Sequence, residues 1–426
     1  MASALTPAQG ADMLKRLAFH EVGPAPEMEI AFGSRLSLLT GDNGLGKSFV
    51  LDTAWWALTR TWARRLVVPQ LPPARPSITF AYTKKTDGDY EYTSTFDRST
   101  DSWTVKPSRP PIPGLVLYAQ VDGGFAVWDP ARNYWKKDAP ERPQAYLFKP
   151  EEVWDGNPLC EGLIRDWASW QRENGDDFAA LKRVLEALSP SASQPISPGE
   201  LRKISVFDPK QYPTVRMSYG ADVPVVHASA GMRRILAVAY LLIWTWREHV
   251  ANCQLLGTAA TKEIILLFDE IDAHLHPQWQ RRIVPALLSV MDVLTGDHNA
   301  SVQLIAATHS PLVLASVEPT FDVEQDKQFV LEENDGEVSL REAVWAKQGD
   351  VLNWLVSDTF GLAQGRSIEA ERAIEAAEAL MRGDANLPDG LQTGAVIHAE
   401  LERVLPGYDP FWPRWIIWVE NREARK

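Results

Sequence analysis

Cysteine is scarce in this chain, which has only two in 426 residues, Cys160 and Cys253. Two isolated cysteines provide neither a disulfide framework nor the paired spacing of a zinc site, so both are expected to be small, buried side chains. The sequence also lacks an apolar run of about 18 residues, which predicts no transmembrane helix and no membrane partner. Its first residues lack a basic segment followed by an apolar stretch, which predicts no signal peptide and a cytoplasmic location.

An excess of positive charge is also absent. The formal net charge is −13, which argues against a broadly basic surface for binding nucleic acid. Local basic clusters occur at Arg60, Arg64 and Arg65 and at Arg202 and Lys203, and the favoured interpretation is a solvated helix face. Hydrophobic residues make up 45% of the chain and charged residues 23%, which is typical of a globular protein with a substantial core.

A glycine-rich segment at residues 41–48 fits the pattern G-x-x-x-x-G-K-[ST]. It follows the apolar, strand-like residues 36–40, and it precedes residues 49–58, whose apolar positions have helical spacing. In that context the backbone N–H groups and the helix N-terminus bind phosphate, Lys47 reaches the β- and γ-phosphates, and the Ser48 hydroxyl is a ligand for Mg²⁺. The residues of this segment expected to bind nucleotide are Asn43, Gly44, Gly46, Lys47, Ser48 and Phe49.

A second motif is the apolar run at residues 264–268, which ends in Asp269 and Glu270. The carboxyl end of a buried parallel strand lies at the sheet edge that also holds the phosphate loop. Asp269 is therefore expected to hold Mg²⁺ through water, together with Ser48. Glu270 is expected to polarise the attacking water as a general base.

Two further strand ends carry polar residues. Residues 302–307 form an apolar run that leads to His309, whose imidazole is expected to contact the γ-phosphate and orient the water. Gln120 follows the strand-like residues 115–119, and its amide oxygen is expected to support Mg²⁺ and the water.

These motifs, in this order and together with Asp272, resemble the head of an ABC-type ATPase. The resemblance implies a signature loop ahead of residues 264–268, and residues 227–234 match it with Ala230 and Met232 in place of Gly and Gln of L-S-G-G-Q. It further implies that the Ser229 hydroxyl and the Gly231 N–H contact the γ-phosphate of a partner subunit. Two heads would then sandwich ATP and Mg²⁺ in a homodimer or a higher oligomer, with residues 272–276 as the loop that crosses the dimer seam.

The histidines of that loop, His274 and His276, raise the alternative of a metal site. Two histidines two residues apart, before a proline and with no cysteine nearby, make a poor zinc site. The loop that crosses the dimer seam is therefore the favoured interpretation.

The predicted fold class is α/β, a P-loop ATPase head with a parallel sheet. The head is expected to span residues 1–320, with an antiparallel β insertion at 77–110 and a helical insertion at 150–200. Residues 321–426 are expected to be mostly helical. Their aromatic cluster, residues 409–418, either packs onto its own core or binds a partner, because tryptophan and arginine are enriched in interface hot spots.

Among ABC-type proteins, residues 14–19 and the phosphate loop resemble soluble ATPases of the RecF/SMC-like and OLD-like groups. No Asp-x-Asp pair follows residue 320, so the TOPRIM nuclease of OLD-like proteins is not expected. The layout resembles the ATPase subunit of Septu-like anti-phage systems, which implies a separate effector such as an HNH-type nuclease. The alternatives are a RecF-like DNA-repair ATPase, which binds DNA, and a nucleotide sensor with little turnover.

Overall fold

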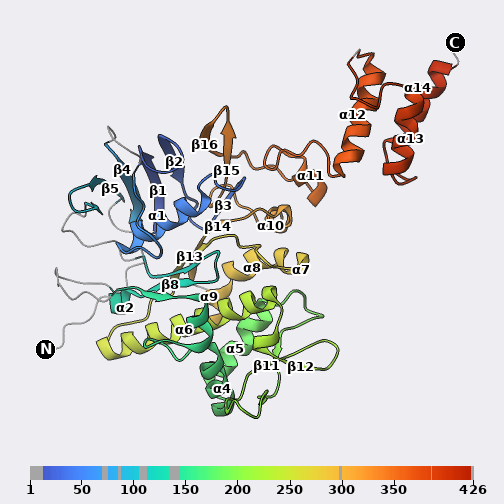
Figure 1. The fold of residues 1–426 in the computed structure, drawn as a ribbon. Coiled ribbons are helices and arrows are strands. Elements are labelled where there is room, and N and C mark those ends of the chain that lie inside the picture. Colours follow the sequence, from blue (N-terminus) through green and yellow to red (C-terminus); the bar gives the residue numbers. More distant parts are fainter. Residues whose placement is uncertain are drawn as a thin grey trace. The chain divides into compact units, whose positions relative to one another are not determined.

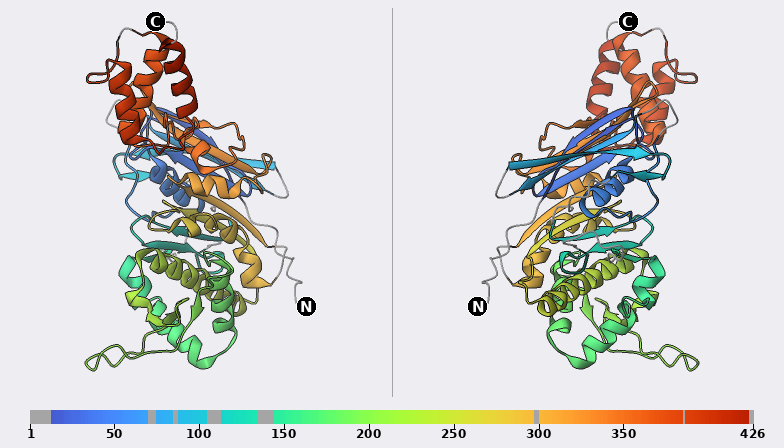
Figure 2. Two further views of the ribbon diagram at one scale, coloured as in Figure 1. Left: turned by 90° about the vertical axis from the view of Figure 1, so that its right-hand side faces the viewer. Right: turned by 90° about the vertical axis from the view of Figure 1, so that its left-hand side faces the viewer.

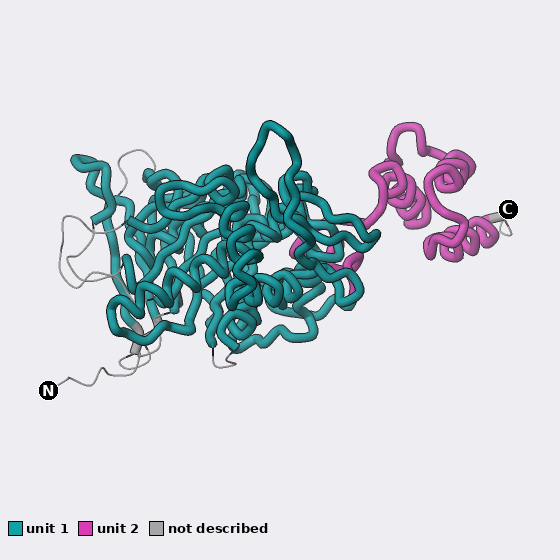
Figure 3. Tube along the Cα trace, turned by 90° about the horizontal axis from the view of Figure 1, so that it is seen from below, with its two compact units in different colours: residues 1–349 teal, residues 350–426 magenta. Residues whose placement is uncertain are grey.

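The computed structural model describes residues 13–69, 75–84, 88–104, 113–133, 144–296, 300–384 and 386–423. The chain divides into two compact units, residues 1–349 and residues 350–426 (Figure 3). Within the described ranges, no helix combines the length and the apolar character needed to cross a membrane.

The first unit is built on an eight-stranded sheet with the order β16-β15-β3-β14-β13-β7-β8-β9 (Figure 1). Its strands are β3 (Leu36–Gly41), β7 (Leu115–Ala119), β8 (Phe125–Trp128), β9 (Tyr146–Phe148), β13 (Glu263–Phe268), β14 (Ser301–Ala307), β15 (Asp326–Asn334) and β16 (Glu337–Glu342). The five strands from β15 to β7 pair in parallel, and the strands at both edges pair antiparallel. Strands β13 and β14 read as apolar runs because both of their faces are covered. The predicted α/β class with a parallel sheet is confirmed.

A second, antiparallel sheet has the order β2-β1-β4-β5-β6. Its strands are β1 (Met13–His20), β2 (Glu27–Ala31), β4 (Ser77–Lys84), β5 (Gly88–Asp97) and β6 (Ser102–Trp103). The strands expected within residues 77–110 thus join the two N-terminal strands in one sheet. Residues 105–110 of the expected insertion lie outside the described residues.

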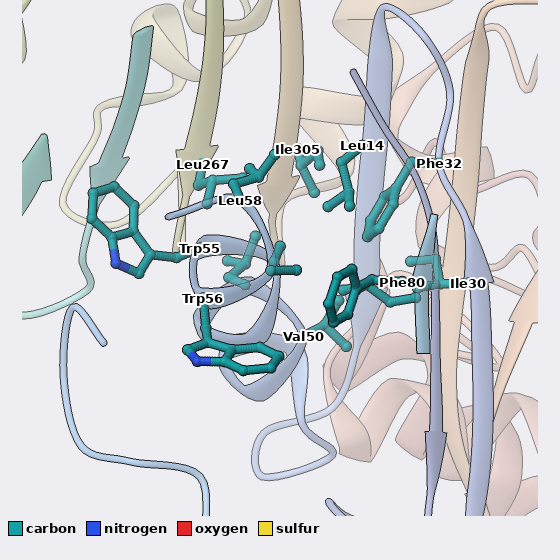
Figure 4. Close-up of a cluster of buried hydrophobic side chains, with 14 of the residues drawn as sticks. Leu14, Ile30, Phe32, Val50, Trp55, Trp56, Leu58, Phe80, Leu267 and Ile305 are labelled. Carbon is teal, nitrogen blue, oxygen red and sulfur yellow. The ribbon is translucent and has the colours of Figure 1, made fainter. Parts of the chain in front are cut away.

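The helix that follows the phosphate loop, α1 (Lys47–Thr59), lies between these two sheets. Figure 4 shows its buried side chains meeting Leu267 and Ile305 of the main sheet on one side and Phe80 of the antiparallel sheet on the other. Trp55 and Trp56 are almost fully buried, and removing the Trp56 indole from water stabilises the fold by about 4 kcal/mol. The phosphate loop is therefore anchored at its helical end by the core of the unit.

Helices and a small sheet lie beyond the β8–β9 edge of the main sheet (Figure 2). They are α2 (Pro130–Asn133), α3 (Pro150–Asp155), α4 (Leu163–Glu173), α5 (Asp176–Ala187), the strands β10 (Ser197–Pro198), β11 (Thr214–Arg216) and β12 (Asp222–Pro224), the 3₁₀ turn η1 (Val225–His227) and α6 (Ala230–Leu256). The short helices α7 (Pro277–Gln280), α8 (Ile283–Leu288), α9 (Val290–Thr295) and α10 (Pro311–Val317) flank β13 and β14. The long helix α6 begins within residues 227–234, which are expected to form the signature loop and are called the signature segment below.

The region after residue 320 differs from the expectation in its first part. Strands β15 and β16 belong to the main sheet, where β15 pairs in parallel with β3, and the first compact unit runs to Gly349. The mostly helical part begins only after that residue. Because β15 pairs with a strand nearly 300 residues earlier, no local pattern announces where it belongs.

The second unit contains α11 (Val351–Leu355), α12 (Ile368–Arg382), α13 (Gly394–Val404) and α14 (Trp412–Glu423). Helices α12 to α14 bury a core of their own that includes Phe411 and the fully buried Trp415, whose indole Nε1 donates to His398 Nδ1 at 2.9 Å. These two aromatic residues of the C-terminal cluster therefore pack within their own unit. Tyr408 and Ile417, by contrast, are exposed.

Candidate functional site

The phosphate loop joins the end of β3 to the start of α1, in the strand–loop–helix order that the motif requires. Gly41 and Gly46 have φ angles of +131° and +102°, which L side chains rarely adopt. A Cβ on Gly41 would lie 2.2 Å from the Leu331 carbonyl oxygen, and one on Gly46 would lie 2.6 Å from Pro24 Cγ. Both positions therefore require glycine because of the backbone conformation and because of the lack of space.

Lys47 lies at the first position of α1, with only 6% of its surface exposed. Its Nζ donates to the carbonyl oxygens of Gly41 at 2.8 Å and Asp42 at 2.7 Å, so the ammonium group is curled into the loop. Burial lowers the pKa of Lys47, while the nearby carboxylates of Glu270 and Asp269 act in the opposite direction. The group is a buried hydrogen-bond donor at the position where a phosphate would enter the loop.

Asn43, Gly44 and Phe49 complete the expected phosphate-binding segment. Asn43 and Gly44 are exposed in the turn between β3 and α1. The Phe49 ring packs against Phe19, with 4.8 Å between ring centroids, so it belongs to the contact with the antiparallel sheet. The N–H groups of a helix's first turn have no partner within the helix, so the backbone N–H of Phe49 is the group that the expected role would use.

The Ser48 hydroxyl donates to Asp269 Oδ1 at 3.0 Å. Asp269 directly follows β13 and is 1% exposed. A hydroxyl and a carboxylate oxygen are hard ligands of the kind that Mg²⁺ prefers. Two residues that the sequence assigns to one metal site, 221 positions apart, are therefore in direct contact.

Gln120 and Glu270 follow the ends of β7 and β13, which are neighbouring parallel strands. The Asp269 N–H donates to the Ala119 carbonyl oxygen at 2.9 Å, so the two strand ends lie side by side. Gln120 is 7% exposed. Glu270 has a φ of +47°, an uncommon conformation for a residue other than glycine, and such residues gather at functional sites.

Arg234 of α6 binds both of these strand ends. Its Nη2 donates to the carbonyl oxygens of Asp269 at 2.8 Å and Glu270 at 3.1 Å, and its Nη1 lies 3.5 Å from the Gln120 carbonyl oxygen. Burial lowers the pKa of Arg234, and the carboxylates of Asp269 and Glu270 oppose that effect. No sequence pattern singles out Arg234, which connects α6 to the residues predicted to hold Mg²⁺ and to act as general base.

His309 follows the end of β14, the neighbour of both β3 and β13. Asp272 Oδ1 accepts from the His309 N–H at 3.1 Å and from the Thr308 hydroxyl at 2.6 Å, which fixes the backbone of this segment. Among the residues that the structure describes, the His309 Nε2 atom is buried and has no hydrogen-bond partner. A buried polar atom without a partner costs about 1–3 kcal/mol, so a ligand that supplied one would be favoured here.

The signature segment lies at the start of α6. Ser229 caps this helix by accepting from the Met232 N–H at 3.3 Å, and its side chain is exposed. Gly231 is buried, and a Cβ at this position would lie 2.4 Å from the His274 carbonyl oxygen. Gly231 thus packs directly on residues 272–276, the segment expected to cross a dimer seam. The signature segment and this segment are therefore in contact within one chain.

We expect Gly231→Ala to destabilise the first unit by about 1–3 kcal/mol, because the added methyl group meets a backbone carbonyl and the packing must shift. Thermal unfolding measures the effect as a lower Tm. Gly175→Ala is the control without a steric clash, because nothing lies within 4 Å of the Cβ it would add. Gly175 is the N-cap of α5, so only the smaller loss that alanine causes at an N-cap is expected there. An unchanged Tm for Gly231→Ala would show that the contact with His274 relaxes freely.

The alternative metal site at His274 and His276 gains no support. His276 Nδ1 accepts from the Gln278 N–H at 3.3 Å and so caps α7. Across the described part of the chain, no group of three or more His, Cys, Asp or Glu side chains is arranged to hold a metal ion.

The sequence predicts a solvated helix face for Arg64, but Arg64 lies after the end of α1 and its guanidinium contacts two carboxylates. Its Nη2 donates to Asp269 Oδ2 at 2.8 Å, and its Nε donates to Asp52 Oδ1 at 3.0 Å. The signal in the sequence is Asp52, the one carboxylate of a largely buried helix, because a buried charge needs a partner. The sequence gives no indication of which arginine supplies it.

Comparison with protein families gives a match over residues 36–315 to the family described as "AAA domain, putative AbiEii toxin, Type IV TA system". The Septu protein PtuA of Bacillus mycoides is 26% identical over 191 residues, 44% of this chain and 23% of that protein. The "Retron Vc95 probable ATPase" of Vibrio cholerae is 47% identical over 144 residues, 34% of this chain and 26% of that protein. The matched segments thus span about a quarter of each relative.

Solved structures with a similar arrangement include the SMC head domain from Thermotoga maritima, with 14% identity and a TM-score of 0.40 over 78% of this chain and 99% of that chain. The structure described as the recombination mediator protein RecF-ATPrS of the RecFOR pathway has 11% identity and a TM-score of 0.39 over 80% of this chain and 100% of that chain. Both scores are low, and the fold class rests on the sheet topology described above. The family model, in contrast, covers well over half of the sequence, and the chain belongs to this AAA-domain family.

Proposed function

We propose that this chain binds ATP with Mg²⁺ at the phosphate loop and hydrolyses it in an ATP-sandwiched homodimer or higher oligomer. The observation that carries the proposal is the convergence at one sheet edge. Four adjacent parallel strands, in the order β3, β14, β13, β7, end at this edge. The loop after β3 leads to Lys47 and Ser48, and His309 follows β14. Asp269 and Glu270 follow β13, and Gln120 follows β7. No single motif requires the others to lie there, so their convergence favours one composite site.

Each residue has a role in this proposal. Lys47 and the loop N–H groups hold the phosphates, and Ser48, Asp269 and Gln120 hold Mg²⁺, which when bound neutralises charge on the phosphate oxygens. Glu270 accepts a proton from the attacking water. His309, through the unpartnered Nε2 atom, contacts the γ-phosphate and orients that water.

The other half of the site would come from a second subunit. The exposed Ser229 hydroxyl and the N–H of Gly231 would reach the partner's γ-phosphate, with Asn43 and Gly44 also open to solvent on the loop. Such a site predicts that the ATP hydrolysis rate per subunit rises with protein concentration. A measurable rate that stays constant over a wide dilution series would remove the dimeric mechanism and leave a monomeric ATPase.

We further propose that the ATPase regulates a separate effector in anti-phage defence, by analogy with relatives named as components of Septu and retron systems. The second unit is the suggested binding surface. A pocket of about 720 Å³ within it is lined by Leu352, Val356 and Tyr408, among others. Tyr408 and Leu352 are 89% and 61% exposed, respectively, and exposed apolar side chains around a pocket are typical of interaction sites.

The effector proposal is tested by co-expression with the HNH-type nuclease expected from a neighbouring gene. Tyr408→Glu is expected to abolish co-purification, because it places a charge at the rim of the pocket. Val396→Glu is the control, since Val396 is 46% exposed on α13 and does not line the pocket. Equal recovery of the nuclease with both variants would exclude this surface.

A further inference from the structure

A buried ionic cluster lies directly behind the expected metal site. Arg64 donates from Nη2 to Asp269 Oδ2 at 2.8 Å and to the Tyr118 hydroxyl at 2.7 Å, and from Nε to Asp52 Oδ1 at 3.0 Å. The Tyr118 hydroxyl in turn donates to Asp52 Oδ1 at 2.9 Å. One guanidinium therefore connects the helix after the phosphate loop, the strand before Gln120 and the carboxylate after β13.

Most side chains of this cluster are buried. Tyr118 is fully buried, Asp269 is 1% exposed, and the side chain of Arg64 is 25% exposed. Burial raises the pKa of Asp52, and the positive charge of Arg64 opposes that shift.

Both carboxylate oxygens of Asp269 are engaged. Oδ1 accepts from the Ser48 hydroxyl at 3.0 Å, and Oδ2 accepts from Arg64. A cation that approaches Asp269 and Ser48 meets a positive charge already in contact with the same carboxylate. Like charges at this range in a poorly hydrated site repel strongly.

The charges of the cluster do not cancel. Asp52 and Asp269 each contribute −1 when ionised and Arg64 contributes +1, which leaves one negative charge for these three groups. That remaining charge attracts a divalent cation, but less strongly than two uncompensated carboxylates would. The balance between Arg64 and Asp52 therefore sets how strongly the site attracts a cation.

We propose that Arg64 is a built-in counter-ion of Asp269 that competes with Mg²⁺ and sets the Mg²⁺ concentration at which the nucleotide site fills. The inference rests on the proposed function. Arg64 is a positioning residue, since it acts on the metal through Asp269. The consequence is that the cation binds firmly only together with the phosphates of a nucleotide, whose negative charge offsets the repulsion.

The test is a titration of free Mg²⁺ with the full chain and a fixed concentration of fluorescent ATPγS, which reports binding without turnover. Arg64→Gln is expected to lower the half-saturating Mg²⁺ concentration about tenfold, because a competing charge is removed. Arg64→Lys, which keeps the charge, is expected to stay within about twofold of the wild type. The free nucleotide chelates Mg²⁺ equally in every sample, so a difference in the half-saturating Mg²⁺ concentration comes from the protein.

Two further variants make the test independent of the folding of Arg64→Gln. Asp52→Asn removes a negative charge but keeps an acceptor for Arg64 and Tyr118, so it is expected to raise the half-saturating Mg²⁺ concentration several-fold. Arg65→Gln is the matched control, since Arg65 is the exposed neighbour of Arg64 in the same loop, and it is expected to change nothing.

The outcomes separate the inference from the proposed function. Opposite shifts for Arg64→Gln and Asp52→Asn support the inference. A wild-type protein that binds the nucleotide normally, combined with an unchanged or higher midpoint for Arg64→Gln, overturns it and leaves the ATPase proposal intact. A wild-type protein that binds no nucleotide at any Mg²⁺ concentration overturns the proposed function itself.

Discussion

Lys47→Ala is expected to weaken ATP binding at least about 100-fold. The ammonium group already donates two hydrogen bonds inside the phosphate loop, to the carbonyl oxygens of Gly41 and Asp42, so it needs only a small movement to donate to phosphate. A hydrogen bond that involves a charged group contributes about 1.5–3 kcal/mol, and the loss of two such bonds corresponds to a factor of at least about 100 in the dissociation constant. Isothermal titration with ATP and Mg²⁺ measures the change.

The matched control is Lys203→Ala, which removes an exposed lysine of the first unit and is expected to leave the affinity unchanged. Thermal unfolding without nucleotide must accompany the titration, because the charge of Lys47 lies close to Asp269 and Glu270. If a folded Lys47→Ala protein bound ATP as tightly as the wild type, the phosphate site would have to lie elsewhere in the chain.

Glu270→Gln is expected to reduce ATP hydrolysis about 10²–10⁴-fold, the range that a positioned general base contributes, while nucleotide binding is kept. The amide has nearly the shape of the carboxylate but cannot accept the proton from water. The left-handed backbone at this residue, with φ of +47°, serves either side chain equally well. Phosphate release under saturating ATP measures the loss.

Glu324→Gln, at an exposed turn of the same unit, is the control and should hydrolyse ATP at the wild-type rate. The same comparison separates an ATPase from a nucleotide sensor. A wild-type protein with negligible turnover, unaltered by Glu270→Gln, would favour the sensor and remove Glu270 from its catalytic role.

Much of the site could be predicted from local sequence. The glycine spacing of the phosphate loop and the two apolar runs before Asp269 and His309 are short-range patterns with a direct structural meaning. Buried parallel strands must be apolar, and their carboxyl ends meet at one edge, so a strand that ends in polar residues predicts a site there. The contact between Ser48 and Asp269 follows from that rule.

The partners behind those residues could not be predicted. Arg64 lies 205 positions from Asp269 in the sequence, and Arg234 reaches backbone carbonyl groups, which any sequence provides. Such pairings depend on where the loop after α1 and the start of α6 lie relative to the strand ends. The spacing of residues along the chain does not predict these long-range contacts.

The C-terminal region illustrates the same limit. Its aromatic cluster was compatible with a partner site or with self-packing, and composition alone could not separate the two. In the structure, Phe411 and Trp415 fill the core of the second unit while Ile417 stays exposed. One segment thus serves packing at some positions and leaves others available for a partner.

We propose that the phosphate loop is half of a site that a second subunit completes. Sedimentation velocity of Glu270→Gln, with and without ATP and Mg²⁺, is the decisive experiment, because bound ATP should persist in this variant. The expected result is a monomer without nucleotide and a dimer or larger assembly with it. If the variant binds ATP under these conditions and still sediments as a monomer, the site is not shared between two subunits.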